Sequence, residues 1–354
     1  MTSLTEITSL SHEFGTWRYV KGGGGNSSVK DAQTCWVKPS GTSLASITES
    51  AFVAMDREKL ALLYDVKPPV IPAERETLVL EAMNNAKRDL NSGRPSVEAP
   101  LHESIKAKYV VHTHPELVNG LTCAKDAKQW CLELFPEAMW VDYIDPGYTL
   151  CMVVRQMLFD FEAKNGQQPN LIFLKNHGIF VSGETPEDIR NSYKYVIDKL
   201  KFTYEASNVS IEFSRNPIED DAHAVAAKQF IQKQYPQDDI FIEACSAFNL
   251  AEDAITPDHS VYSKSFFFTG QPKTALLNLF AEKYGYLPCV IAYDGMVFGI
   301  GATKTKAALA LELAVDGSCI LQLSKAFGGI NYMAEKSRLF IENWEVESYR
   351  SKQL

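Results

Sequence analysis

The chain has 354 residues, of which 45% are hydrophobic and 22% are charged. This composition suits a compact soluble protein of one large or two ordinary domains, with enough apolar residues for a sizeable core. The formal net charge of −9 at pH 7 excludes a generally basic surface, so we expect no binding to nucleic acid or to an anionic membrane. The expected partner is a small molecule.

Two further features favour a cytoplasmic location. The first residues lack a basic segment followed by an apolar run, and no later stretch is expected to reach a membrane-spanning length. The seven cysteines are odd in number and include no C-x-x-C pair, which favours buried thiols in a reducing compartment over disulfides.

The first predicted element is a short helix over residues 8–21, which runs into four glycines at residues 22–25. A glycine run is unsuited to the interior of a helix or strand, so it predicts a loop. Backbone N–H groups of such a loop can face an anion, with Asn26, Ser27 and Ser28 as side-chain donors. A flexible connector is the alternative interpretation.

A predicted strand at residues 34–37 leads into a turn that contains Lys38, Ser40 and Gly41. The turn is either an ordinary connection between strands or a second wall of an anion pocket, to which Lys38 would add a positive charge. Helical periodicity predicts two scaffold helices after it, over residues 49–64 and 73–91.

The strongest signal is a pair of histidines at the end of an apolar run, His112 and His114. On a strand, side chains at i and i+2 point to the same face, so both imidazoles can converge on one cation. His177 ends another apolar run, and three neutral imidazoles with one open position form a known catalytic zinc arrangement. Glu98 could bind the ion or move protons beside it, whereas His102 is expected at most to support a ligand.

The remaining elements of this half are expected to form a core that clamps the histidine-bearing strands. Apolar residues at helical spacing, and one predicted N-terminal helix cap, define most of these elements. They are a helix at residues 116–131, a strand at 140–145, a helix at 149–163 and a long helix that begins after Thr185.

Five short motifs occur in one order along this half, and together they resemble the class II aldolase/adducin family over about residues 8–205. The motifs are Gly25-Asn26-Ser27-Ser28, Lys38-Pro39-Ser40-Gly41, Pro95-Ser96-Val97-Glu98, His112-Thr113-His114 and Asn176-His177-Gly178. The rest of the chain is similar to the aldolase part of the bifunctional rhamnulose-1-phosphate aldolase/alcohol dehydrogenases, and we expect no dehydrogenase after Leu354. The segments that carry this second resemblance are residues 256–259, 295–303 and 340–347.

The resemblance implies a role for each motif. His112, His114 and His177 would bind Zn²⁺, although another divalent metal would also fit, and Glu98 would be the catalytic acid/base. Gly25, Asn26, Ser40, Gly41 and Ser96 match the family's phosphate-binding loops, and Ser27 and Lys38 complete the predicted substrate site as further donors.

The chain departs from the family pattern at one position. Phosphate-binding members commonly have two hydroxyl residues before the acid, whereas this chain has Ser96 and Val97. Either Lys38 compensates for the missing donor or the substrate carries no phosphate.

The implied fold class is α/β, as a three-layer α/β/α domain with a mostly antiparallel central sheet. Active sites of the family commonly lie at subunit interfaces, so a homo-oligomer such as a tetramer is expected. A tyrosine often acts as proton donor in these enzymes, and the candidates here are Tyr143, Tyr148 and Tyr349.

We predict a catalytic domain at residues 1–210 and a C-terminal α/β extension at residues 211–354. Residues 287–303 repeat the outline of residues 169–185, with strand, polar turn and strand before a helix. Aligning Gly301 with Gly183 places Phe298 on Phe180 and Gly295 on His177. The extension is therefore either a degenerate, metal-free aldolase-like half or an ordinary unit of this common pattern.

The function implied by the resemblance is that of a zinc-dependent aldolase, which cleaves or forms a carbon–carbon bond in a ketose or ketose 1-phosphate of the rhamnulose or fuculose type. The reaction would pass through an enediolate, which three neutral ligands favour because they leave the ion its full charge. A sugar-phosphate 4-epimerase or decarboxylase on the same scaffold is one alternative. A non-catalytic, adducin-like assembly protein is another.

Overall fold

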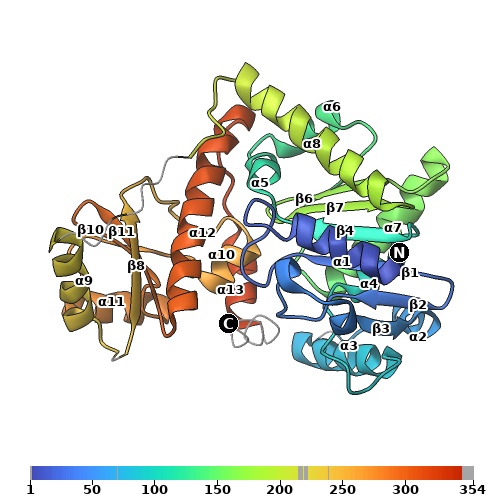
Figure 1. Cartoon of the computed structure of the whole chain (residues 1–354), viewed down its shortest axis with the longest axis horizontal. Coiled ribbons are helices and arrows are strands. Elements are labelled where there is room, and N and C mark those ends of the chain that lie inside the picture. The colour runs from blue at the N-terminus through green and yellow to red at the C-terminus, as the bar shows by residue number, and fades with distance from the viewer. Residues whose placement is uncertain (1, 70, 214–217, 219–221, 238, 345–354) are drawn as a thin grey trace. The chain divides into compact units, whose positions relative to one another are not determined.

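A computed structural model describes residues 2–69, 71–213, 218, 222–237 and 239–344 of the chain, and only the backbone of Pro72 and Ala73. The described residues fall into two compact units (Figure 1). The first contains residues 2–118 and 127–202, and the second contains residues 119–126 and the described residues from 203 onward.

The first unit is built on a seven-stranded sheet with the order β3-β2-β1-β4-β7-β6-β5. Only the pair β5 and β6 is parallel, so the predicted, mostly antiparallel sheet is confirmed. The strands are β1 (Asn26–Lys30), β2 (Thr34–Val37), β3 (Val53–Asp56), β4 (Tyr109–Thr113), β5 (Met139–Val141), β6 (Leu171–Leu174) and β7 (Gly178–Gly183).

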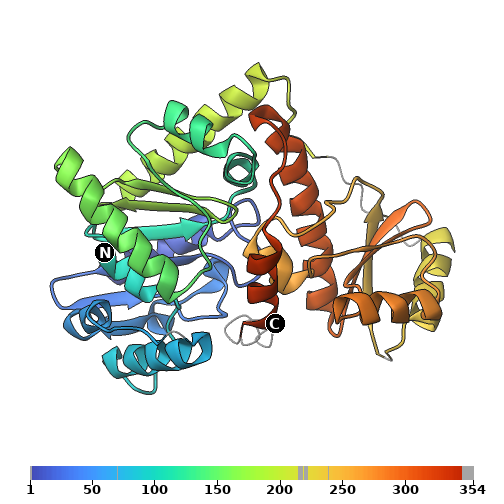
Figure 2. The same ribbon diagram turned by 180° about the vertical axis from the view of Figure 1, so that it is seen from behind.

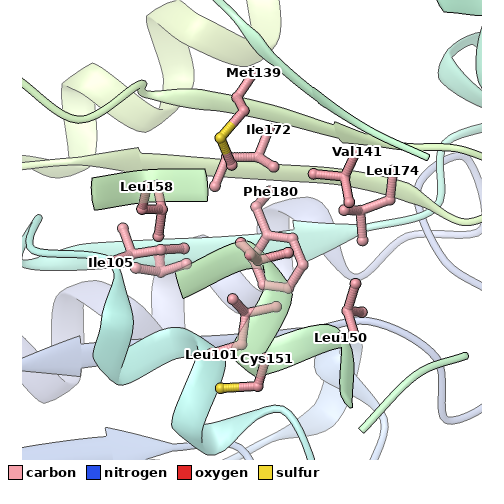
Figure 3. Packing of buried hydrophobic residues seen from close by; sticks show 12 residues of the cluster. Leu101, Ile105, Met139, Val141, Leu150, Cys151, Leu158, Ile172, Leu174 and Phe180 are labelled. Atoms are coloured by element: carbon pink, nitrogen blue, oxygen red, sulfur yellow. The ribbon is translucent and has the colours of Figure 1, made fainter. Parts of the chain in front are cut away.

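Helices cover both faces of this sheet, which gives the predicted three layers (Figures 1 and 2). On one face, α4 and α7 pack on a buried cluster that includes Leu101, Leu158 and Phe180 (Figure 3). On the other face, Tyr193 of α8 reaches the hydroxyl of Thr113 at 2.6 Å. The helices are α1 (Ser3–Phe14), α2 (Arg57–Ala61), α3 (Pro72–Ala86), α4 (Ala99–Ser104), α5 (Glu116–Thr122), α6 (Ala127–Leu134), α7 (Tyr148–Asn165) and α8 (Pro186–Ala206).

Some predicted helix boundaries were wrong. The first helix is α1, which ends at Phe14 rather than continuing to residue 21. Residues 49–64 contain two short 3-10 turns, β3 and α2 instead of one helix. Val53 and Met55 are buried in alternation on β3, which is the period of a strand, but a segment of four residues is too short for its period alone to decide between strand and helix. The helix predicted at residues 116–131 is divided into α5 and α6.

The second unit contains a four-stranded sheet with the order β8-β11-β10-β9. Its strands are β8 (Phe241–Ser246), β9 (Phe268–Thr269), β10 (Val290–Tyr293) and β11 (Met296–Gly301). Its helices are α9 (Ala222–Gln234), α10 (Pro257–Tyr262), α11 (Thr274–Tyr284), α12 (Lys304–Leu323) and α13 (Glu335–Asn343).

This small sheet repeats the topology of β4-β7-β6-β5 in the first unit. In the second unit, β11 pairs antiparallel with β8 and β10, and β10 pairs parallel with β9. In the first unit, β7 likewise pairs antiparallel with β4 and β6, and β6 pairs parallel with β5. The order of helices along the chain also agrees. The first unit has α7, β6, β7 and α8 in succession, and the second unit has α11, β10, β11 and α12. The two sheets therefore share strand order and strand directions, and the origin of the second as a degenerate copy stays a prediction.

The paired registers identify the positions in the second unit that correspond to the histidines. Ala244 pairs with Phe298 as His112 pairs with Phe180, so Ser246 lies at the position of His114. The turn of the β10 and β11 hairpin is residues 294–295, one residue shorter than residues 175–177. None of these positions in the second unit carries an imidazole.

The residues from Lys304 to Phe327 correct the expectation that no stretch reaches membrane-spanning length. By length and composition this helix could cross a membrane, since its mean hydropathy is 1.4 over an 18-residue window. However, 72% of that window is buried inside the protein. A buried apolar helix of this kind is typical of the core of a soluble domain.

Candidate functional site

Three imidazoles from two neighbouring strand ends meet on one side of the first sheet. His112 lies on β4, His114 follows that strand, and His177 lies in the turn between β6 and β7. Their ligand nitrogens all lie within 4.8 Å of one another, with the Nε2 atom of His112 3.0 Å from that of His114 and 3.3 Å from that of His177. His112 and His177 are buried, and His114 is partly exposed.

Close backbone approach brings the third imidazole to the other two. β4 and β7 are adjacent and antiparallel, so the residues after β4 lie beside those before β7. A Cβ atom at Gly178 would lie 2.3 Å from the carbonyl oxygen of Thr113 and 2.8 Å from Cδ2 of His114, so only glycine fits there. Asn176 turns the chain before His177 with a φ of 51°, a left-handed conformation that asparagine tolerates better than most residues.

The arrangement of nitrogens fits a divalent cation. Two nitrogens that each bind a tetrahedral zinc at about 2.0–2.1 Å are about 3.3 Å apart. The separations of 3.0 and 3.3 Å from His112 to His114 and His177 are close to this value. The Nδ1 atom of His112 lies 2.9 Å from the carbonyl oxygen of Ile179, to which it can donate its proton. That donation would leave a lone pair on Nε2 for a metal, the usual orientation of a ligating histidine.

The carboxylate of Glu98 faces the same group. Its Oε2 atom is 3.8 Å from Nε2 of His112, and the side chain is only 5% exposed. Glu98 immediately precedes α4 but makes no capping bond there, so its carboxylate is directed toward the sheet. The amide of Asn26 donates a hydrogen bond to Oε2. The structure therefore places a buried carboxylate beside three imidazoles, and a role for Glu98 in proton transfer stays a prediction.

Two loops that were predicted to bind substrate are joined by backbone hydrogen bonds. The amide of Ser40 donates to the carbonyl of Arg94 at 2.8 Å, and the amide of Ser96 donates to the carbonyl of Lys38 at 3.2 Å. Gly41 adopts a positive φ of 79° in the first loop. The hydroxyl oxygen of Ser40 is buried and has no hydrogen-bond partner among the described residues, so it is available to a ligand.

Lys38 has a different environment from the one that its predicted role suggests. Its side chain is 2% exposed, and its ammonium donates to the carbonyls of Gly23 and Thr42. These bonds tie the glycine loop to the turn after β2. A direct contact between Lys38 and substrate stays a prediction.

The residues after the glycine loop alternate between the two faces of β1. Gly25 has a φ of 65°, and a Cβ atom there would lie 2.8 Å from the carbonyl oxygen of His112. Asn26 pairs with His112 across the sheet and points to the histidine face. The hydroxyl of Ser27 instead lies 2.7 Å from that of Ser11 on α1, so a substrate contact by the Ser27 side chain stays a prediction.

Sequence reasoning missed the contact of Phe180 with the histidines, and it expected His102 at most to support a ligand. The ring of Phe180 stacks on His112, with centroids 3.9 Å apart and planes 10° from parallel. His102 is fully buried and contacts both Ser28 and Asn26. Burial lowers the pKa of its imidazole to about 3. The only available signal for His102 was its place one helical turn after Glu98.

The three tyrosine candidates differ in what the structure says of them. Tyr148 is buried, and its hydroxyl donates to the carbonyl of Leu63 at 2.9 Å, which is a structural contact. Tyr143 is partly buried after β5. Tyr349 lies outside the described residues, as does the end of the segment at residues 340–347.

Comparisons with known proteins give distant but consistent relatives. A curated relative, named uncharacterized oxidoreductase YuxG of Bacillus subtilis (strain 168), is 24% identical over an alignment that covers 98% of this chain and 58% of the relative. The chain thus spans little more than half of that protein. No match described here tests the resemblance to the bifunctional rhamnulose-1-phosphate aldolases, which stays a prediction.

Two solved structures are similar to the N-terminal part. One is the N-terminal class II aldolase domain of a conserved protein from Thermoplasma acidophilum, with 22% identity, a TM-score of 0.49 and coverage of 57% of this chain and 93% of that one. The other is L-fuculose-1-phosphate aldolase from Thermus thermophilus, with 15% identity, a TM-score of 0.38 and coverage of 58% and 96%.

A family model provides the decisive match. The model of the class II aldolase and adducin N-terminal domain matches residues 5–201, which is more than half of the chain. This range includes every strand of the first sheet, Glu98 and the three clustered histidines. The chain therefore belongs to the class II aldolase and adducin N-terminal domain family.

Proposed function

We propose that this protein is a divalent-metal-dependent class II aldolase that forms or cleaves a carbon–carbon bond in a ketose or ketose 1-phosphate. The observation that carries the proposal is the convergence of three imidazoles within 4.8 Å of one another, with a buried carboxylate 3.8 Å from one of them. Membership of the family supports the same reading.

His112, His114 and His177 would hold Zn²⁺ or another divalent ion. When bound, such an ion acts as a Lewis acid toward a carbonyl and its adjacent hydroxyl, and it stabilises the negative charge that develops on their oxygens. Three neutral ligands suit this role because they do not offset the charge of the ion. The apolar ring of Phe180 behind His112 fixes the orientation of that imidazole.

Glu98 would move the proton at the reacting carbon. Its carboxylate lies beside the imidazoles and is shielded from water, so it can accept a proton from a bound ketose and return it to the new product. The hydrogen bond from Asn26 orients this carboxylate. A carboxylate held in place in this way needs little reorganisation during proton transfer.

The two joined loops would hold the far end of the substrate. Ser40 offers a hydroxyl that has no partner among the described residues. The hydroxyl oxygen of Ser96 accepts from Asn26 and from the amide of Glu98, so its proton is what it can donate to a ligand. Gly25 and Gly41 adopt positive φ in the turns of these loops. Lys38 would keep both loops in place and add positive charge near them. Binding energy from this end orients the carbon to be cleaved.

The cellular context follows from the same reading. We expect a cytoplasmic enzyme that acts on a small sugar or sugar phosphate and assembles as a homo-oligomer, such as a tetramer. A tyrosine from a neighbouring subunit would then donate a proton to the oxygen of the incoming aldehyde when the bond forms and take that proton back when the bond is cleaved, as the family resemblance implies.

Metal analysis and an aldol assay test this proposal. The purified protein should contain one divalent metal per chain, and His112→Ala and His177→Ala should each lose it. The metal-loaded protein should join dihydroxyacetone phosphate to lactaldehyde, and Glu98→Gln should keep the metal while losing most of the activity. Assays with unphosphorylated dihydroxyacetone would show whether Val97 changes the need for phosphate.

Other outcomes identify other functions. A metal-containing protein that epimerises or decarboxylates a sugar phosphate without aldol activity would place the same site in a different reaction. A protein that holds no stoichiometric divalent metal at neutral pH would overturn the enzyme proposal and favour an assembly role.

A further inference from the structure

His102 is a buried titratable side chain near the site for which the proposed chemistry has no use. It lies on α4, with none of its surface exposed. Its ring meets Phe180 edge to face at 5.4 Å, and Phe180 in turn stacks on His112. His102 is thus separated from the three clustered imidazoles by an aromatic ring and cannot join them as a ligand.

The polar atoms of His102 are directed toward β1 instead. Nδ1 lies 2.7 Å from the hydroxyl oxygen of Ser28, and Nε2 is hydrogen bonded to Oδ1 of Asn26. Ser28 and Asn26 are two residues apart on one strand, so both side chains point to the face that α4 covers.

Asn26 forms hydrogen bonds with both His102 and Glu98. The carbonyl oxygen of its amide faces His102, and its NH₂ group donates to Oε2 of Glu98 and, at 3.4 Å, to the hydroxyl of Ser96. The three side chains therefore form a line from imidazole to amide to carboxylate.

Chemistry fixes the direction of this line. In its proposed role as a base Glu98 is ionised. An ionised carboxylate only accepts hydrogen bonds, so the NH₂ group of Asn26 faces Glu98 and Oδ1 faces His102. Oδ1 also only accepts, so Nε2 of His102 must carry the proton, and the lone pair on Nδ1 accepts from the Ser28 hydroxyl. If the proton were on Nδ1 of His102 instead, Nε2 would accept and would favour a flipped Asn26 amide. The flipped amide would turn Oδ1 toward the carboxylate, so that two acceptors would face each other.

We propose that His102 is a positioning residue, whose Nε2 proton sets the orientation of the Asn26 amide and thereby holds the Glu98 carboxylate toward the metal-binding histidines. This inference rests on the proposed role of Glu98, but its geometry does not depend on the identity of the substrate. Lys30 holds the backbone of α4 independently, because its ammonium donates to the carbonyls of His102 and Ile105.

A matched pair of substitutions tests the proposal. Glutamine can place an N–H donor near the position of Nε2, whereas asparagine can place one near Nδ1, so His102→Gln should retain the bond to Asn26 and His102→Asn should lose it. Both are polar and smaller than histidine. Ser28→Ala removes only the other hydrogen bond of the ring and controls for a purely structural effect.

The first measurement does not require turnover. In metal-free protein labelled with ¹⁵N-asparagine, the side-chain NH₂ signal of Asn26 is assigned by its loss in Asn26→Asp. We expect this signal to be unchanged in His102→Gln and Ser28→Ala. In His102→Asn it should move, and its protons should exchange with water about tenfold faster, because the amide is no longer held at Oδ1.

The second measurement separates binding from chemistry with dihydroxyacetone phosphate and lactaldehyde. His102→Asn should retain its metal and change KM less than about threefold, while kcat falls at least about tenfold because the proton-transfer group is misaligned. His102→Gln should recover most of the kcat.

Two results would overturn the inference: an unchanged Asn26 signal in His102→Asn, or equal defects in the glutamine and asparagine variants. If the wild-type protein shows no aldol activity, the proposed function fails while the amide signal still decides the role of His102.

Discussion

The ring of Phe180 lies parallel to the imidazole of His112, with centroids 3.9 Å apart and an interplanar angle of 10°. Phe180 also belongs to the buried cluster between the sheet and the helices α4 and α7 (Figure 3). The core of the first unit therefore extends directly to one of the histidines. Packing and metal binding should be coupled through this ring.

Phe180→Leu should weaken metal binding by about tenfold, because an imidazole without its stacked support loses its fixed orientation. The fold should survive, with a loss of unfolding free energy of about 1–3 kcal/mol. Metal competition with a chelator and thermal unfolding check these values. Phe173→Leu is the matched control, since Phe173 is equally buried and stacks on Phe135, at 5.0 Å, rather than on a histidine. Equal metal affinity in both variants would contradict the coupling.

Gly178→Ala should abolish tight metal binding, because the added methyl group would lie 2.3 Å from the Thr113 carbonyl and 2.8 Å from the His114 ring. The strands must separate or the imidazole must move. Gly166→Ala is a suitable control, since Gly166 has a positive φ of 82° but open space around it. That control should lose about 1 kcal/mol of stability through backbone strain alone and keep its metal.

Acid should destabilise the protein partly through His102. Its pKa is lowered to about 3 by burial, so the folded ring stays neutral while the unfolded ring takes up a proton below its usual pKa of about 6.5. Between these two values the unfolded state binds more protons, so stability is lost as the pH falls. The contribution reaches up to about 1.4 kcal/mol per pH unit.

Denaturant unfolding of metal-free protein at several pH values between about 6.5 and 4 measures this dependence. His102→Gln has no titrating ring at this position and should show a shallower decline in the free energy of unfolding. Parallel curves for the two proteins would show that His102 is not held neutral by the fold.

The second unit should bind no metal. Its positions that correspond to His112, His114 and His177 are Ala244, Ser246 and the short turn at residues 294–295. Titration of the full chain with Zn²⁺ at neutral pH should therefore saturate tightly at one ion. A second tight ion that survives in His112→Ala would disprove the expectation that this unit is metal-free.

Much of the site could be predicted because its signals are local. His112 and His114 share a face by strand periodicity, and glycine or asparagine marked the turns that carry the loops and His177. The edge strand β3 was missed because it has only four residues, too few for the alternate burial of Val53 and Met55 to reveal a strand within a longer helical pattern. Such short segments take their form from the neighbour with which they pair.

The amino-acid sequence by itself determined the family, the candidate ligands and the candidate acid, since these depend on residue type and order. Only the tertiary structure decided which side chains face one another. It directed Lys38 to backbone carbonyls, turned Ser27 toward Ser11 and aligned His102, Asn26 and Glu98. Hydrogen bonds and ring stacking act over a few ångströms, and here they join residues that lie far apart in the chain. A local sequence pattern contains no information about the distance between such residues.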